Sequence, residues 1–117
     1  AFWSRSSGLK APLRIDSAAG IAAAHLMRAR LGLGGGQLVA NPIPAGAEIA
    51  RDEIVPVIEA ALAEAAAQGI AAKAVTPFLL ARIFEMTGGR SLAANIELVL
   101  NNARLAAAIA TEIAARR

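Results

Sequence analysis

The sequence predicts an α/β fold in which one or two short strands precede a C-terminal layer of about three helices. Two observations support this prediction. A helical segment over residues 17–30 leads almost directly into a short apolar run at 37–41, and a helix followed at once by a buried strand is typical of parallel α/β sheets. After residue 50, three helical patterns follow one another with short breaks and no strand between them.

The composition limits the kinds of protein that this chain can be. Its 117 residues suit one domain or a portion of a larger one, and residues are 56% hydrophobic but only 3% aromatic, which favours closely packed helices. The net charge of +3 comes from scattered arginines without interleaved aromatics, so no nucleic-acid partner is expected. Charged residues interrupt every apolar stretch before the ~20 residues that span a bilayer, so no membrane partner is expected either. The lack of cysteine excludes disulfides and fits a cytoplasmic protein.

The first predicted elements are a brief strand and a helix. The opening stretch, AFWSRSSG, is aromatic at one end and rich in serine and glycine at the other, which we interpret as a short strand running into a loop. Asp16 or Ser17 then provides the N-cap of a helix that ends at the glycine-rich segment after residue 31. Gly20 lowers the intrinsic stability of this helix and indicates close packing at that point.

The predicted buried strand at 37–41 ends in Asn41-Pro42, where the chain must leave the sheet. Ligands of open α/β sheets bind beyond the carboxyl ends of strands, so Asn41 is a candidate binding residue from its position alone. Asn-Pro is also an ordinary turn pair, and the sequence leaves both interpretations open.

The second half of the chain contains the three predicted helices. The first covers about 50–69, with acidic residues in its first turn and Gly69 as its end. The second begins with Thr76 at the N-cap and Pro77 at the first helical position, and it ends at the glycine pair that follows. The last helix covers about 91–115 and is rich in alanine and leucine.

The sequence contains few residues that could carry chemistry. Lys10 and Lys73 could form a Schiff base if they were buried, but nothing in the sequence signals burial of either, and the sequence favours solvated lysines at both positions. The single His25 cannot build a histidine cluster for zinc. No Ser-His-Asp order, phosphate-binding loop or paired-carboxylate motif is present.

Two polar features of the last helix stand out. The GGRS junction at its start, with Arg90 and Ser91, is either an anion-binding site at a helix N-terminus or simply a C-cap followed by an N-cap. Further along, Asn95 and Asn102 are seven residues apart and therefore share a helix face with Ser91. Because a buried amide without partners is costly, these amides must either bind loop backbone or face a polar ligand.

Several segments together resemble the pseudouridine-5′-phosphate glycosidase (IndA-like) family. They are SRSSGL, RIDS, ANPIP and the long stretch GIAAKAVTPFLLARIFEMTGGRSLAANIELVLNNARLAA. The resemblance covers nearly the whole chain in the same order, and 76–103 is its most specific part. It implies that residues 1–117 form the C-terminal portion of a single glycosidase domain whose N-terminal part is absent.

The resemblance also implies an activity and a set of site residues. Members of this family break, or in reverse form, the C–C bond between uracil and ribose 5-phosphate. They use a lysine Schiff base, acid/base carboxylates and a divalent metal, commonly manganese, and they assemble as trimers with an α/β/α sandwich fold. Those groups lie upstream of this chain, so the resemblance implies that this portion alone is inactive and that any metal is bound outside it.

Within this chain, the motif SLxxNIxLVxNNA assigns the catalytic asparagine to Asn95, with Asn102 as a substrate-binding residue. Ser91, Arg90 and Asn41 are further candidates for substrate binding. The alternative is a non-catalytic helical module or split-gene subunit that packs on a partner.

Overall fold

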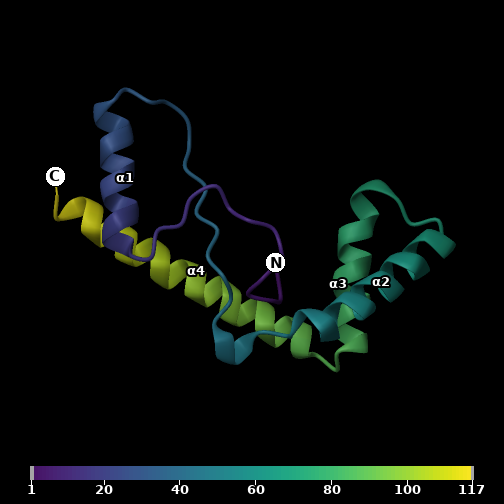
Figure 1. The fold of residues 1–117 in the computed structure, drawn as a ribbon. Helices are drawn as coiled ribbons and strands as arrows, with labels where there is room; N and C mark the ends of the chain where they lie inside the picture. Colours follow the sequence, from purple (N-terminus) through teal and green to yellow (C-terminus); the bar gives the residue numbers. More distant parts are fainter. Residues whose placement is uncertain (1, 117) are drawn as a thin grey trace. The chain divides into compact units, whose positions relative to one another are not determined.

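The computed structural model describes residues 2–116, and its regular structure is helical (Figure 1). The four α-helices are α1 (Ala18–Arg30), α2 (Arg51–Ala67), α3 (Val75–Met86) and α4 (Arg90–Ala114), and two 3₁₀ turns cover Ala45–Ala47 and Ala72–Ala74. The chain divides into two units: one contains the residues up to Ser7 with Pro42–Val99, and the other contains Gly8–Asn41 with the residues from Leu100 onward.

The predicted α/β fold, with its one or two short strands, is wrong for this chain, because residues 2–116 contain no strand. The run 37–41, predicted to be a buried strand, is irregular and largely exposed, with Leu38 95% exposed. A strand is stable only when a neighbouring strand satisfies its backbone N–H and C=O groups. No other described segment offers such a partner, so the apolar pattern alone could not produce a strand.

The predicted N-terminal strand is also absent, and within residues 2–7 the chain bends at 3–5 and is otherwise irregular. The segment is fastened to the residues before α2. The Ile49 N–H donates to the Trp3 carbonyl at 2.9 Å, and the Ser4 hydroxyl donates to the Ile49 carbonyl at 2.8 Å. These two bonds hold Trp3 in place without building a ladder.

α1 begins where the sequence predicted. Ser17 is the N-cap, and its hydroxyl accepts a hydrogen bond from the Gly20 N–H at 3.1 Å, while Asp16 pairs with Arg14 outside the helix. Gly20 lies in close packing, as predicted, because a Cβ built there would come within 2.7 Å of Cγ2 of Ile15. Ile21 is one of two buried residues of this helix.

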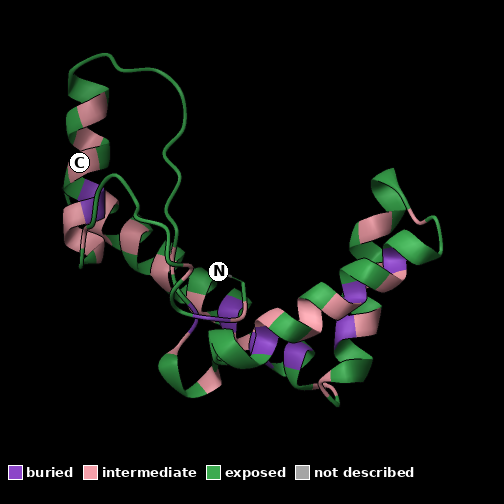
Figure 2. Cartoon of the chain, turned by 45° about the vertical axis from the view of Figure 1, so that its right-hand side comes forward, coloured by how far each residue is buried: buried purple, intermediate pink, exposed green. Residues whose placement is uncertain are grey.

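The hydrophobic core of the first unit lies where α2, α3 and the start of α4 converge (Figure 2). Isoleucine and alanine dominate it, as the low aromatic content suggested. Its buried members are Ile43, Ile49, Ile54, Ala61, Ile83, Ala94 and Leu98, with Trp3, Ala47, Val57, Ile58 and Leu79 packed against them.

α2 and α3 form a hairpin that an ion pair ties together. Arg82 of α3 donates two hydrogen bonds to the Glu64 carboxylate of α2, at 2.7 and 3.0 Å, and a third at 2.9 Å to Glu85. Gly69, the predicted end of α2, has a φ of +67°, which favours glycine at this position because it lacks a Cβ. The helix itself ends two residues earlier, at Ala67.

The start of α3 differs from the prediction. The helix begins at Val75, and its N-cap is Ala74 rather than Thr76. A 3₁₀ turn leads into it and provides the preceding helical turn, so no side-chain cap is used.

Candidate functional site

The junction between α3 and α4 is made by two glycines and a threonine. Gly88 and Gly89 have φ values of +57° and +86°, which let the chain reverse within a few residues. The Thr87 hydroxyl donates to the Ile83 carbonyl at 2.8 Å and accepts from the Ser91 N–H at 3.1 Å. Thr87 therefore satisfies one free N–H of the first turn of α4, a role that we had predicted for Ser91.

Ser91 itself lies inside α4 and is buried, with 4% of its surface exposed. Its carbonyl accepts a hydrogen bond from the indole N–H of Trp3 at 3.0 Å. The ring of Phe2 meets the Trp3 ring edge-on, with centroids 4.7 Å apart and an interplanar angle of 78°. This arrangement places two aromatic rings against the first turns of α4.

These rings line a cavity of about 310 Å³ that we call the aromatic hollow. Its walls come from the N-terminal segment, from α3 and from α4. The lining residues are Phe2, Trp3, Leu80, Phe84, Ser91, Leu92 and Asn95. A hollow of this size with mostly apolar walls and one or two polar groups has the general character of a small-molecule site.

Asn95 provides the only side-chain amide in the lining of this hollow. The residue is half-buried, and no residue in the range 2–116 forms a hydrogen bond with its side chain. The amide can donate two hydrogen bonds and accept two, so it could pair with a ligand group that carries both a carbonyl and an N–H. Because it is neutral, it could orient or polarise a ligand but could not exchange protons with it.

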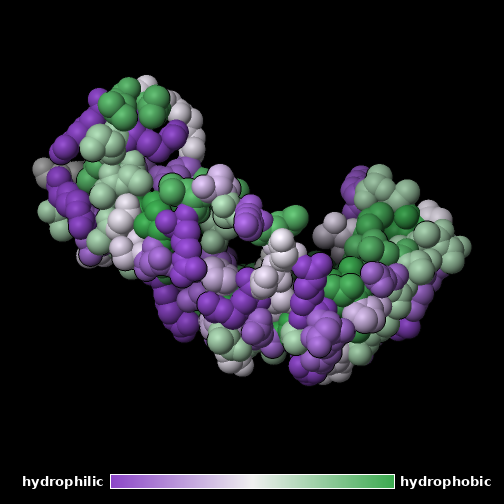
Figure 3. Space-filling view, in the orientation of Figure 1, coloured by the Kyte–Doolittle hydropathy of each residue, from purple (hydrophilic) through white to green (hydrophobic). Residues whose placement is uncertain are grey.

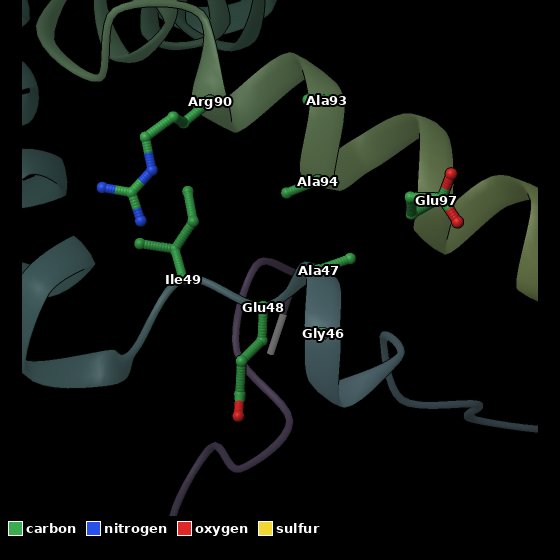
Figure 4. Close-up of a pocket in the computed structure, with 8 residues that line it drawn as sticks. All are labelled: Gly46, Ala47, Glu48, Ile49, Arg90, Ala93, Ala94 and Glu97. Carbon is green, nitrogen blue, oxygen red and sulfur yellow. The ribbon is translucent and has the colours of Figure 1, made fainter.

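Arg90 lines a different cavity from Asn95. Its guanidinium pairs with the Glu53 carboxylate in the first turn of α2. The cavity beside it, of about 340 Å³, is lined on one side by Ala93 and Ala94 of α4 and on the other by Gly46 and Ala47 of the 3₁₀ turn (Figure 4). Arg90 and Glu97 project from α4 at the two ends of the cavity, and Glu48 and Ile49 complete the lining. We call it the alanine hollow.

The alanine hollow offers less to a ligand than the aromatic one. The positive charge of Arg90 is already compensated by Glu53, and the Glu48 carboxylate already accepts from the Arg5 N–H at 2.9 Å. Gly46, Ala47, Ala93 and Ala94 have no side-chain donor or acceptor, which leaves Glu97 as the one charged lining group without a hydrogen-bond partner among residues 2–116. The aromatic hollow is therefore the better candidate site, and the structure places Ser91 and Asn95 there but not Arg90.

Asn41 and Asn102 lie in the other unit and bind each other. The Asn41 side-chain N–H₂ donates to the Asn102 side-chain oxygen at 3.1 Å. This bond joins the end of the irregular run 37–41 to α4, and it goes to the Asn41 side chain, whereas we had considered loop backbone or a polar ligand as the partner of these amides. Neither residue lines either hollow.

The charged residues do not form a second candidate site. Lys10 and Lys73 are both exposed, and neither lines a hollow. Among residues 2–116, no group of three or more acidic or histidine side chains could hold a metal ion. Hydrogen bonds from Arg82 hold the pKa of the Glu64 carboxyl below its ordinary value of 4.5, but this pair lies between α2 and α3, outside both hollows.

Sequence reasoning missed five residues of the aromatic hollow: Phe2, Trp3, Leu92, Leu80 and Phe84. A signal was present for the last two. They are four residues apart on α3 and both lie off the face that carries the buried Ile83, so an exposed apolar pair could have been predicted. No local pattern indicated that the N-terminal rings would pack against α4, since that contact spans 88 residues.

None of the helices within residues 2–116 is both long enough and apolar enough to cross a membrane. Comparison with known proteins gives much more specific information. A profile of the family described as Indigoidine synthase A like protein matches residues 1–112. Two relatives are both named pseudouridine-5′-phosphate glycosidase. The one from Paracoccus denitrificans is 71% identical over 97% of this chain, and the one from Jannaschia sp. is 67% identical over 94% of it.

A third relative of the same name, from Nocardioides sp., is 57% identical over 99% of this chain. The chain spans only 36–38% of these relatives, as a C-terminal portion. With a family profile that covers residues 1–112 and identities this high, the chain belongs to the indigoidine synthase A-like family.

Proposed function

We propose that this chain is the C-terminal portion of a glycosidase that cleaves pseudouridine 5′-phosphate to uracil and ribose 5-phosphate, and that also catalyses the reverse reaction. The observation that carries this proposal is the 71% identity over 97% of the chain to a protein of that name. The aromatic hollow supports it, because a planar ring suits a site lined by Phe2, Trp3 and Phe84.

In this proposal, Asn95 binds the uracil ring. A uracil edge presents carbonyl oxygens beside an N–H, and one side-chain amide can match such a pair by donating to the oxygen and accepting from the N–H. When the C–C bond breaks, its electron pair stays on the ring until the ring carbon takes up a proton. A carbonyl oxygen of the ring then carries developing negative charge, and the Asn95 N–H₂ stabilises it. Ser91, Arg90, Asn41 and Asn102 remain candidate substrate contacts, of which Ser91 alone lines the same hollow.

The nucleophile is proposed to lie outside this chain. A Schiff base requires a lysine close to the sugar, and the two lysines here are exposed and line neither hollow. A divalent metal, manganese by the resemblance, is likewise proposed to be held by residues outside this chain. The complete enzyme is proposed to be a cytoplasmic homotrimer, and sedimentation of the chimera described next tests its oligomeric state.

Two preparations test the proposal. One is the 117-residue chain alone, and the other is a chimera in which this chain replaces the matching segment of the Paracoccus denitrificans relative. Uracil release from pseudouridine 5′-phosphate is followed by chromatography, and each protein is treated with ribose 5-phosphate and borohydride and analysed by mass spectrometry. Circular dichroism confirms that both samples are helical.

We expect activity and a trapped adduct only with the chimera. An adduct on Lys10 or Lys73 of the chain alone would show that the nucleophile is misplaced in this proposal. A helical, folded chimera without activity would instead favour a non-catalytic module, provided that the parent relative is active under the same conditions.

A further inference from the structure

The first half of α4 has two apolar faces. One face is buried in the core and carries Ala94 and Leu98. The other carries Leu92, Ile96 and Val99, which are 49%, 50% and 57% exposed. Their spacing of four and three residues puts them on one stripe of the helix. A helix that is apolar on two opposite sides is typical of one that is covered on both.

The exposed stripe continues onto α3. Leu80 and Phe84 are 45% and 43% exposed, and they line the aromatic hollow together with Leu92. Figure 3 shows strongly hydrophobic side chains at the surface of the α2–α3 hairpin. We call these five residues, Leu80, Phe84, Leu92, Ile96 and Val99, the apolar strip. None of them is charged or polar, so water is a poor partner for this surface.

The length of the relatives indicates what covers the strip. This chain corresponds to only 36–38% of the relatives, and the remaining polypeptide precedes the matched portion. Phe2 and Trp3, near the start of the match, line the aromatic hollow and therefore lie beside Leu92 of the strip. A polypeptide joined ahead of Phe2 would begin at the edge of this surface, where it can be buried without a long connection.

We propose that the apolar strip is the docking surface for the polypeptide that precedes this portion in the complete protein. The docking itself does not depend on any catalytic activity.

The test compares Ile96→Lys in the chain alone and in the chimera with the Paracoccus denitrificans relative. Lysine is at least as good a helix former as isoleucine, so helix propensity does not oppose the change. In the chain alone, the exposed site should tolerate it with a melting-temperature change within about 2 °C. In the chimera, the ammonium would be buried against apolar groups, and we expect the melting temperature to fall by at least about 5 °C.

A matched control is Leu62→Lys on α2, where the leucine is 45% exposed but lies outside the strip. It should have a small effect in both proteins. If the lysine variant of the chimera does not fold, the milder Ile96→Ser replaces it. This variant should also lower the melting temperature more in the chimera than in the chain alone, by a smaller amount. Melting is recorded without substrate, so the result does not depend on whether the chimera is a glycosidase.

Equal shifts for Ile96→Lys in the chain alone and in the chimera would overturn the proposal, as would equal shifts for Ile96→Lys and Leu62→Lys in the chimera. Sedimentation of the chain alone distinguishes another occupant, a second copy of the chain. If the chain self-associates, Ile96→Lys abolishes the association, and the chimera tolerates the substitution, then the strip is a surface between copies and the proposal is wrong.

Discussion

Replacing Asn95 with alanine should raise the stability of the protein and lower its activity. The amide has no hydrogen-bond partner within residues 2–116, so its removal breaks no bond in the folded chain. Alanine is a better helix former than asparagine by about 0.6 kcal/mol, and residue 95 lies inside α4. The stability gain of roughly half a kcal/mol corresponds to a rise in melting temperature of about 1–2 °C in a complete enzyme.

The effect on activity has the opposite sign and is larger. If the amide stabilises charge that develops on the ring, its loss should reduce kcat by about 10²–10³-fold, or roughly 3–4 kcal/mol of transition-state stabilisation. Asn95→Asp should be at least as damaging, because it replaces the donating N–H₂ with an anionic oxygen of similar size. A change in KM without a change in kcat would indicate that the amide binds substrate and transition state equally.

The assay is uracil release by the chimera, with thermal melting of the same samples. Asn101→Ala is the control, because it makes the same chemical change on the same helix, and residue 101 lines neither hollow. We expect it to change turnover less than about threefold. A fall in melting temperature of several degrees for Asn95→Ala, with turnover unchanged or lowered equally by both variants, would refute the reasoning and make the amide structural.

Three further predictions concern the scaffold of the site. Ile83 of α3 is 1% exposed, so replacing it with alanine should lower the free energy of unfolding of the protein by about 2–5 kcal/mol, and replacing it with valine should lower it by about 0.5–1.5 kcal/mol, as measured by urea titration. Equal losses for the two variants would contradict its place in the core. Arg82 lowers the pKa of Glu64, so the ion pair stabilises the fold above pH 4.5 and this contribution disappears as the pH falls below that value; the melting-temperature difference between wild type and Glu64→Gln should shrink from pH 7 to pH 3, and a constant difference would argue against the pair. Gly20→Ala should destabilise α1 despite the better helix propensity of alanine, because its Cβ would lie 2.7 Å from Ile15; a raised melting temperature would show that Ile15 moves away freely.

Helix positions were predictable because their signals are local. Ser17 is an N-cap, Gly69 and the pair 88–89 follow helix ends, and the periodic apolar residues of α2 to α4 lie where helical spacing puts them. Local signals could not show that the run 37–41 does not form a strand. An apolar run becomes a strand only beside another strand, and that requirement concerns residues far away in the sequence. With no such neighbour in the described chain, Leu38 is exposed instead of buried.

The candidate site was predictable in part for the same reason. Asn95 and Ser91 could be assigned to one helix face from their spacing, and both line the aromatic hollow. Arg90 was grouped with them because it is adjacent in the sequence. Since successive residues of a helix are rotated by about 100°, its side chain points in another direction, and Arg90 lines the alanine hollow instead. The contribution of Trp3 depends on a hydrogen bond to a residue 88 positions away, which no sequence window contains.

Asn95 and Asn102 lie on the same face of α4, but the neighbours of that face change along the helix, and this difference explains their different roles. Asn95 and Asn102 are two turns apart, so spacing alone predicts a common role. The structure separates them: Asn102 accepts a hydrogen bond from Asn41, whereas Asn95 faces a hollow lined by aromatic rings. An amide that already has a protein partner fixes a loop, and an amide without one can bind a ligand at no cost to the fold. Among the three asparagines of α4, that distinction selects Asn95 as the residue to test first, since Asn101 and Asn102 both have interactions within the described chain.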